Sequence, residues 1–159
     1  MVKKIFLFGS NYKGTDAELQ ACLSDCRSIR DFFKTHGYLV EEYLSEKTLS
    51  WTDLKPKLTA WIQSLRSGDA GVIYYSGHGF QLKDKSGDEK DGQDEAIYFS
   101  EKSYATDDDI RILLQLAKPG VNLFLLFDCL SFRKHGRSTL LSEGLGSGQG
   151  EHRLDQRLY

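Results

Sequence analysis

The chain has 159 residues, which suits one domain built around one hydrophobic core. With 40% hydrophobic and 28% charged residues, its composition is that of a soluble globular protein. The net charge of −2 gives no basic field for nucleic acid or anionic lipid, and no apolar run reaches the length of a membrane span, so we expect neither nucleic-acid nor membrane partners. Three cysteines, two of them four residues apart, form no disulfide framework and favour a reducing, cytoplasmic compartment.

The first third of the chain predicts a strand, a helix and a second strand. Residues 4–9 form an apolar run that is too short for a signal peptide and lacks a small-residue cleavage site, so we interpret it as a buried strand. A helix then follows, capped by Thr15 or Asp16 and ended by Gly37, and residues 38–44 predict the second strand. The helix has an apolar stripe at three- and four-residue steps, made of Leu19, Cys22, Cys26, Ile29 and Phe33.

The remaining pattern continues the alternation. A helix starting at Ser50 or Thr52 precedes a third strand over 70–75, and a brief strand over 96–99 follows an acidic loop. Thr106 caps a helix that runs through residue 117, and 121–127 is the fourth main strand. Residues 133–159 are rich in Gly, Arg, Ser and Gln without apolar periodicity, so we predict a structured domain over 1–132 and a disordered tail over 133–159.

This order of elements predicts an α/β fold with a mostly parallel sheet covered by helices on both faces. Ligands of such sheets bind at the carboxyl ends of the strands. The segments after Gly9, Tyr75 and Phe127 are therefore where a site is expected.

Two of these segments carry reactive side chains. "YYSGHGF" places His78 between two glycines, which permit tight turning and a close approach of substrate, although the tripeptide alone favours an ordinary loop histidine. "NLFLLFDC" brings Asp128 and Cys129 to the same edge of the sheet. His78 and Cys129 are thus a candidate dyad, in which the imidazole takes the thiol proton and the thiolate attacks a carbonyl.

The chain resembles the caspase-like cysteine peptidases, specifically the metacaspases and their bacterial relatives. The matching pieces occur in family order and cover residues 3–129. They are "FGSNYKGTDAELQACLSDCRSIRDFF", "YYSGHGFQLKDKSGDEKDGQDEAIYF" and "ATDDDIRILLQLAKPGVNLFLLFDC". The resemblance implies a caspase-like sheet, incomplete on its C-terminal side, and hydrolysis of peptide bonds after Arg or Lys.

The resemblance also assigns roles to individual residues. His78 matches the family's histidine, and the amide of Gly79 matches an oxyanion donor. Four residues match the pocket for the basic side chain, namely Cys22, Asp25, Ser76 and Asp128. Core packing explains Cys22 equally well, and Asp25 is also consistent with a solvated helix residue.

Many metacaspases need calcium, and Asp94, Asp107 and Asp108 match family ligand positions. Carboxylates suit calcium, but acids in the first turn of a helix are favoured by its dipole without any metal. The acidic loop over 84–95 also contains two lysines and is equally explained as a solvated loop.

The chain departs from the family at the nucleophile. The family motif reads Asp-x-Cys-His-Ser-Gly, so Cys129 matches x and Leu130 stands at the nucleophile position. Residues two apart on a strand share a face, so Leu130 is expected on the face of Asp128 and Cys129 on the other, unless a bulge turns Cys129 back.

One possible set of codons for residues 130–134 suggests a cause. Leu-Ser-Phe-Arg-Lys can be encoded as CTG TCA TTC CGG AAA, which one base later reads Cys-His-Ser-Gly. We hypothesise a frame shift immediately after Cys129, with natural divergence as the alternative.

The sequence raises three possible functions. The first is an active cysteine endopeptidase that uses Cys129, and the second is an inactive caspase-like domain that acts as a partner of other proteins or is a degenerate product. The third, an unrelated binding module, is disfavoured because "FGSNYKGT" lacks the Gly-Lys-Ser/Thr ending of a P-loop. Loss of the strands that follow the nucleophile in the family predicts an exposed sheet edge, open to association with another chain.

Overall fold

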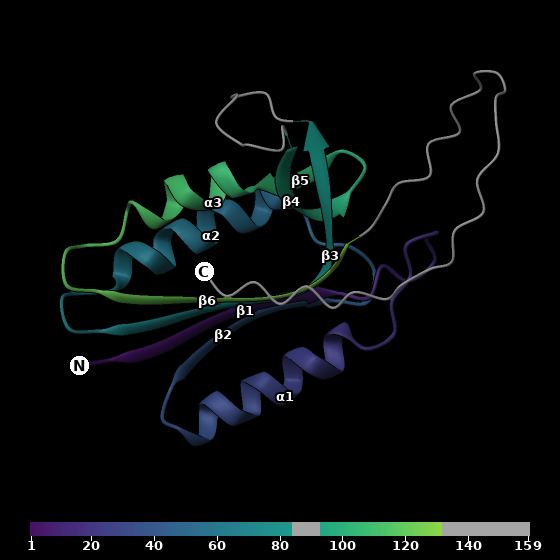
Figure 1. Cartoon of the computed structure of the whole chain (residues 1–159). Helices are drawn as coiled ribbons and strands as arrows, with labels where there is room; N and C mark the ends of the chain where they lie inside the picture. The colour runs from purple at the N-terminus through teal and green to yellow at the C-terminus, as the bar shows by residue number, and fades with distance from the viewer. Residues whose placement is uncertain (84–92, 132–159) are drawn as a thin grey trace, which may run out of the picture.

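Six strands and three helices make up the residues that this computed structural model describes, 1–83 and 93–131 (Figure 1). In chain order they are β1 (Lys3–Ser10), α1 (Cys22–Thr35), β2 (Leu39–Ser45), α2 (Trp51–Ser64), β3 (Ala70–Lys83), β4 (Gln93–Ser100), β5 (Ser103–Thr106), α3 (Asp107–Leu114) and β6 (Asn122–Ser131). The predicted tail over 133–159 lies outside the described residues.

The strands form one mixed sheet in the order β2-β1-β3-β4-β5, with β6 paired to β3. β1 pairs in parallel with β2 and β3, and β3 pairs in parallel with β6. Among the strand pairs in the described residues, only β3–β4 and β4–β5 are antiparallel. The predicted α/β fold with a mostly parallel sheet is thus confirmed.

The helices cover both faces of the sheet, α1 on one and α2 with α3 on the other (Figure 1). Strand alternation divides the apolar side chains between two cores. Ile5, Leu7 and Tyr74 pack with Cys26 of α1, whereas Phe6, Phe8 and Tyr75 belong to the larger core under α2 and α3. α1 turns Cys26, Ile29 and Phe33 of its predicted apolar stripe to the smaller core, and α2 buries Leu54, Leu58 and Ile62 in the larger one. The described helices include none long and apolar enough to cross a bilayer.

The start of the first helix was predicted wrongly. α1 begins at Cys22, not after Thr15 or Asp16, and its N-cap residue Ala21 provides no side-chain hydrogen bond. Thr15 is used instead in a turn, where its hydroxyl donates to the carbonyl of Tyr12. The side-chain oxygen of Asn11 accepts from the amide of Leu23, so a residue distant from the helix start satisfies an amide of its first turn.

The third strand also extends further than predicted. β3 continues from Tyr75 through His78 to Lys83, so the segment expected as a loop is a strand paired with β4. β4 is accordingly longer than predicted, and β5 follows it. Pairing with neighbouring strands overrides the low strand propensity of Ser76, Gly77 and Gly79. The predicted cap of α3 is confirmed, because the Thr106 hydroxyl accepts from the amide of Asp109 in a capping box.

Candidate active site

His78 lies in the second half of β3, between β4 and β6. It is opposite Tyr98 on β4 and opposite Leu130 on β6. Only 5% of the residue is exposed. The parallel strands β1 and β6 end near this position, although β3 itself continues to Lys83. His78 therefore lies beside the carboxyl ends of β1 and β6, where ligands are expected.

A backbone carbonyl orients the imidazole. Nε2 of His78 lies 2.7 Å from the carbonyl oxygen of Ala17, in the segment between β1 and α1. Because a carbonyl only accepts, Nε2 carries the proton and Nδ1 is the basic nitrogen. A histidine in this tautomer can take a proton from a nucleophile on the Nδ1 side. Sequence reasoning missed Ala17, since no side-chain motif marks a carbonyl that is supplied by an irregular loop.

The sheet does not bring Cys129 and His78 to one face. In the parallel register Cys129 is opposite Gly77, and Leu130 is opposite His78. The Cβ of Cys129 lies 3.2 Å from the position that a Cβ on Gly79 would take, which places Cys129 on the face of the odd-numbered residues of β3. Register partners share a face, so position 130, and not Cys129, is beside His78.

The environment of Cys129 does not favour the thiolate. The residue is exposed at the end of β6, yet desolvation of its thiol by the surrounding protein, aided by the carboxylate of Asp128, raises its pKa to about 12. Reactive cysteines have the opposite shift, because a nearby cation or helix N-terminus stabilises their thiolate.

The four residues predicted for the basic pocket do lie together. Cys22 and Asp25 come from the first turn of α1, while Ser76 and Asp128 are register partners on β3 and β6. Burial raises the pKa of the Cys22 thiol, the carboxylates of Asp25 and Asp128 raise it further, and a hydrogen bond with Ser76 opposes them. Cys22 and Ser76 are buried, whereas Asp25 is half-buried and Asp128 is exposed. The cluster therefore combines two carboxylates that solvent can reach with two small, buried side chains, Cys22 and Ser76.

Gly79 lies between β4 and β6, opposite Ile97 and Ser131. A side chain there would approach Cys129 at 3.2 Å and the Ala96 carbonyl at 3.7 Å, so the close approach of the strands favours glycine. Its role as an oxyanion donor stays a prediction.

The predicted calcium ligands are described only in part. Asp107 and Asp108 begin α3, where Asp108 pairs with Arg111. Asp94 is in β4, but its side chain lies outside the described part. Within the described residues, no group of three His, Cys, Asp or Glu side chains could hold a metal ion. The described carboxylates alone thus do not make a calcium site.

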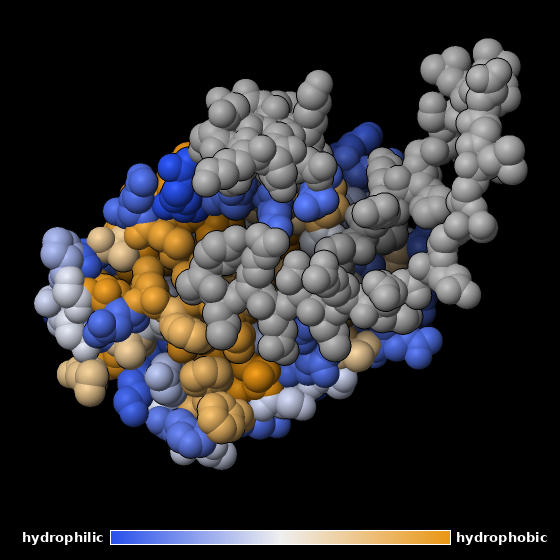
Figure 2. Space-filling model, in the orientation of Figure 1, coloured by the Kyte–Doolittle hydropathy of each residue, from blue (hydrophilic) through white to orange (hydrophobic). Residues whose placement is uncertain are grey.

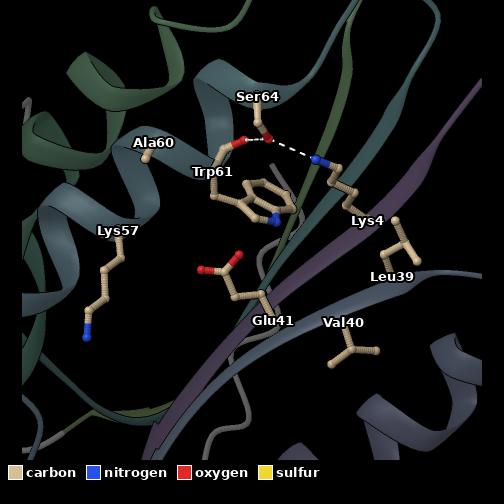
Figure 3. A pocket seen from close by; sticks show the side chains of 8 residues that line it. All are labelled: Lys4, Leu39, Val40, Glu41, Lys57, Ala60, Trp61 and Ser64. Carbon is tan, nitrogen blue, oxygen red and sulfur yellow. Dashed lines mark hydrogen bonds between the residues drawn. The ribbon is translucent and has the colours of Figure 1, made fainter.

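A cavity of about 500 Å³ opens elsewhere, between α2 and β2 (Figure 3). Lys4, Glu41 and Trp61 line it together with Leu39, Val40, Lys57, Ala60 and Ser64. Lys4 pairs with Gly71 near the start of β3, so the cavity is at the amino ends of the parallel strands, remote from His78. It is therefore not part of the candidate active site.

Comparisons with known proteins agree on one family. A family model described as metacaspase, peptidase C14 domain, matches residues 3–134. Metacaspase-4 of Arabidopsis thaliana is 33% identical over 80% of this chain and 33% of its own length. Metacaspase-1A of Neurospora crassa is 36% identical over 79% of this chain and 31% of its own length. The chain thus spans about a third of these two relatives.

The fold has a matching solved structure. The crystal structure of a protein from Geobacter sulfurreducens superimposes with a TM-score of 0.69 and 26% identity, covering 81% of this chain and 50% of that one. Together with the order of the motifs and the placement of His78 on β3, these matches show that the chain belongs to the metacaspase family of peptidases.

Proposed function

We propose that the chain carries a metacaspase-type endopeptidase site for peptides with Arg or Lys before the scissile bond, impaired in hydrolysis because Leu130 occupies the nucleophile position. The observation that carries this proposal is the register of β6 on β3, in which Leu130 and not Cys129 is opposite His78. A leucine has no group that could attack a carbonyl.

The binding half of the site is intact in this proposal. Asp25 and Asp128 offer two carboxylates to a guanidinium or ammonium group, and Arg pairs with carboxylates bidentately. The Gly79 amide would donate to the oxyanion. In this proposal, the carboxylates of Asp94, Asp107 and Asp108 would bind calcium, which would supply a positive charge there.

The test combines cleavage and binding. We expect little or no release of fluorophore from an Arg-terminated peptide, with or without calcium, and saturable binding of the uncleaved peptide by calorimetry. Asp25→Asn with Asp128→Asn should abolish that binding, while a Glu-terminated peptide should not bind. Appreciable turnover that His78→Ala abolishes would contradict the proposed impairment.

The outer edge of β6 supports a second function, association with another copy of the chain. Among the described residues β6 pairs only with β3. Phe124 is 52% exposed and Phe127 is 41% exposed. Figure 2 shows apolar surface between α1 and the α2–α3 pair, where β6 runs in Figure 1. An unpaired apolar edge favours pairing with another strand.

The sequence of β6 complements itself when two copies pair in antiparallel fashion. Placing Leu125 opposite its own copy sets Leu123 opposite Phe127 and Phe124 opposite Leu126. Asn122 then meets Asp128, a polar pair at the end of an apolar row. We propose that a second copy occupies this edge.

Light scattering after size exclusion tests this association. We expect a concentration-dependent dimer that Phe124→Lys converts to monomer. Leu39→Lys is the matched control, because Leu39 is 62% exposed on the opposite edge strand β2. A wild-type monomer at high concentration, or equal effects of the two variants, would refute the β6 interface.

A further inference from the structure

We infer that Tyr12 and Tyr75 are positioning residues for His78. Their hydroxyls form hydrogen bonds with the backbone amide and carbonyl of His78, and Tyr12 belongs to the same loop as Ala17. This inference deepens the proposed function, since it concerns the residue assigned there as the base. The first support is an unusual backbone. Tyr12 has a φ of 54°, in the left-handed region that a bulky residue rarely adopts. It is nevertheless fully buried.

The two hydroxyls meet at the backbone of His78. The amide of His78 donates to the Tyr12 hydroxyl at 3.3 Å, and the Tyr75 hydroxyl donates to the carbonyl of His78 at 2.9 Å. The hydroxyl oxygens lie 2.8 Å apart. These two tyrosines, called the clamp below, therefore fix the backbone amide and carbonyl of His78, which leaves the imidazole little freedom to move along the strand.

The clamp also reaches the neighbouring strand. The Tyr12 hydroxyl donates to the carbonyl of Tyr98, which is opposite His78 on β4. The ring of Tyr12 lies against the imidazole, with centroids 4.9 Å apart. Tyr12 thus touches the peptide unit of His78, its ring and its neighbour on β4, and each contact limits the position of the ring.

Gly77 is the residue that makes room for the clamp. A Cβ on Gly77 would lie 2.3 Å from the Tyr75 hydroxyl and 2.8 Å from the Tyr12 hydroxyl. The hydroxyls hence fill the space beside this strand position. The glycine before the histidine in Ser-Gly-His-Gly is required by these tyrosines, in addition to any need for substrate approach.

The same loop delivers the orienting carbonyl. Tyr12 and Ala17 belong to the segment between β1 and α1, and Ala17 accepts from Nε2 of His78 at 2.7 Å. The amide of Tyr12 donates to the carbonyl of Lys47 at 2.8 Å, which fixes the base of the loop. Burial raises the pKa of Tyr12 to about 12, so its hydroxyl keeps its proton at neutral pH. Removing the hydroxyl should loosen the loop against His78 and weaken the Ala17 contact.

The test measures the ring proton of His78 by NMR, without substrate and in the full chain. In the wild type, nitrogen shifts should report one tautomer with the proton on Nε2, and this proton should exchange slowly. In Tyr12→Phe and in Tyr75→Phe we expect exchange about tenfold faster relative to the amide of Ile73, as for loss of one buried hydrogen bond, and a mixture of tautomers. Tyr43→Phe is the matched control, because the Tyr43 hydroxyl also donates a hydrogen bond, to Glu41, but lies far from His78 on β2.

The inference requires that the variants affect the His78 ring proton more than they affect the Ile73 amide. If the His78 proton accelerates only in step with the Ile73 amide, the tyrosines serve global stability alone and the inference is wrong. An unchanged tautomer and exchange rate in both variants would overturn it as well. Since no substrate is involved, this result is independent of whether peptides with Arg or Lys bind or are cleaved, so the two proposals can fail separately.

Discussion

The α-carbon of Leu130 on β6 is the register partner of His78 on β3. Partners in a parallel pair belong to one face of the sheet, so the strand position that corresponds to His78 on β6 is held by a leucine. This relationship separates the chemistry of the site into two parts. The base and its orienting carbonyl are in place, and the group on which the base would act is absent from the position beside it.

Leu130→Cys should restore a reactive thiol. A cysteine introduced there is expected on the face of His78, whose Nδ1 can take its proton. In a Cys129→Ser background we expect alkylation by iodoacetamide at pH 7 at least about tenfold faster than alkylation of Cys129 in the wild type, as for a thiol of lowered pKa.

The control for this gain is Ser131→Cys in the same background, because position 131 is opposite Gly79 and not His78. Adding His78→Ala to Leu130→Cys should remove the advantage. Equal rates for cysteines at 130 and 131 would contradict the assignment of position 130. The nucleotide sequence of residues 127–137 tests the related frame-shift hypothesis, which requires codons that yield Cys-His-Ser-Gly one base later.

The native Cys129 should be a slow nucleophile. With a pKa of about 12 its thiolate is a small fraction at pH 8, and even with the higher intrinsic reactivity of a basic thiolate we expect alkylation roughly a hundredfold slower than that of a free cysteine peptide. Peptide mapping by mass spectrometry distinguishes it from Cys22 and Cys26. The rate should keep rising through pH 10, and an inflection below pH 8 would show that Cys129 is activated after all.

Sequence patterns predicted the elements whose stability is local or periodic. The buried strands are continuous apolar runs, and Thr106 was predicted as the cap of α3, where the structure has it. The strand period also separates Cys129 from Asp128, and the observed register agrees with it. The extension of β3 was not predictable, since Gly77 and His78 become strand residues only through pairing with β4 and β6.

The contacts that orient His78 could not be predicted from the sequence for a similar reason. Ala17 contributes a backbone carbonyl, which every residue type has. Tyr12 contributes a side chain whose direction depends on a left-handed backbone within an irregular loop. The joint effect of long-range contacts sets both positions, and no spacing in the sequence reports them.

The capping box of α3 provides a stability prediction. The Thr106 hydroxyl accepts from the amide of Asp109 at 3.1 Å, so Thr106→Ala should lower the free energy of unfolding by about 1 kcal/mol. Urea titration followed by circular dichroism measures the change. Thr106→Ser should retain most of the stability. Thr59→Ala is the control, since that hydroxyl donates within α2 to the Lys55 carbonyl and its loss should change stability little. Similar losses for Thr106→Ala and Thr59→Ala would refute the importance of the cap.

Asp69 should make the fold sensitive to acid. Its carboxylate accepts from the amide of Val2 at 2.7 Å and from the amide of Arg66 at 2.9 Å, and these hydrogen bonds lower its pKa. A group whose pKa is lower in the folded state stabilises the fold above its unfolded pKa of about 3.9, and that stabilisation is lost as the pH falls through the folded value. The free energy of unfolding should therefore decline below about pH 4. Asp69→Asn should be less stable at pH 7 and should show a shallower decline in acid, whereas exposed Asp16→Asn should parallel the wild type. If urea titrations from pH 7 to pH 3 give parallel curves for wild type and Asp69→Asn, the two backbone hydrogen bonds do not couple proton binding to folding.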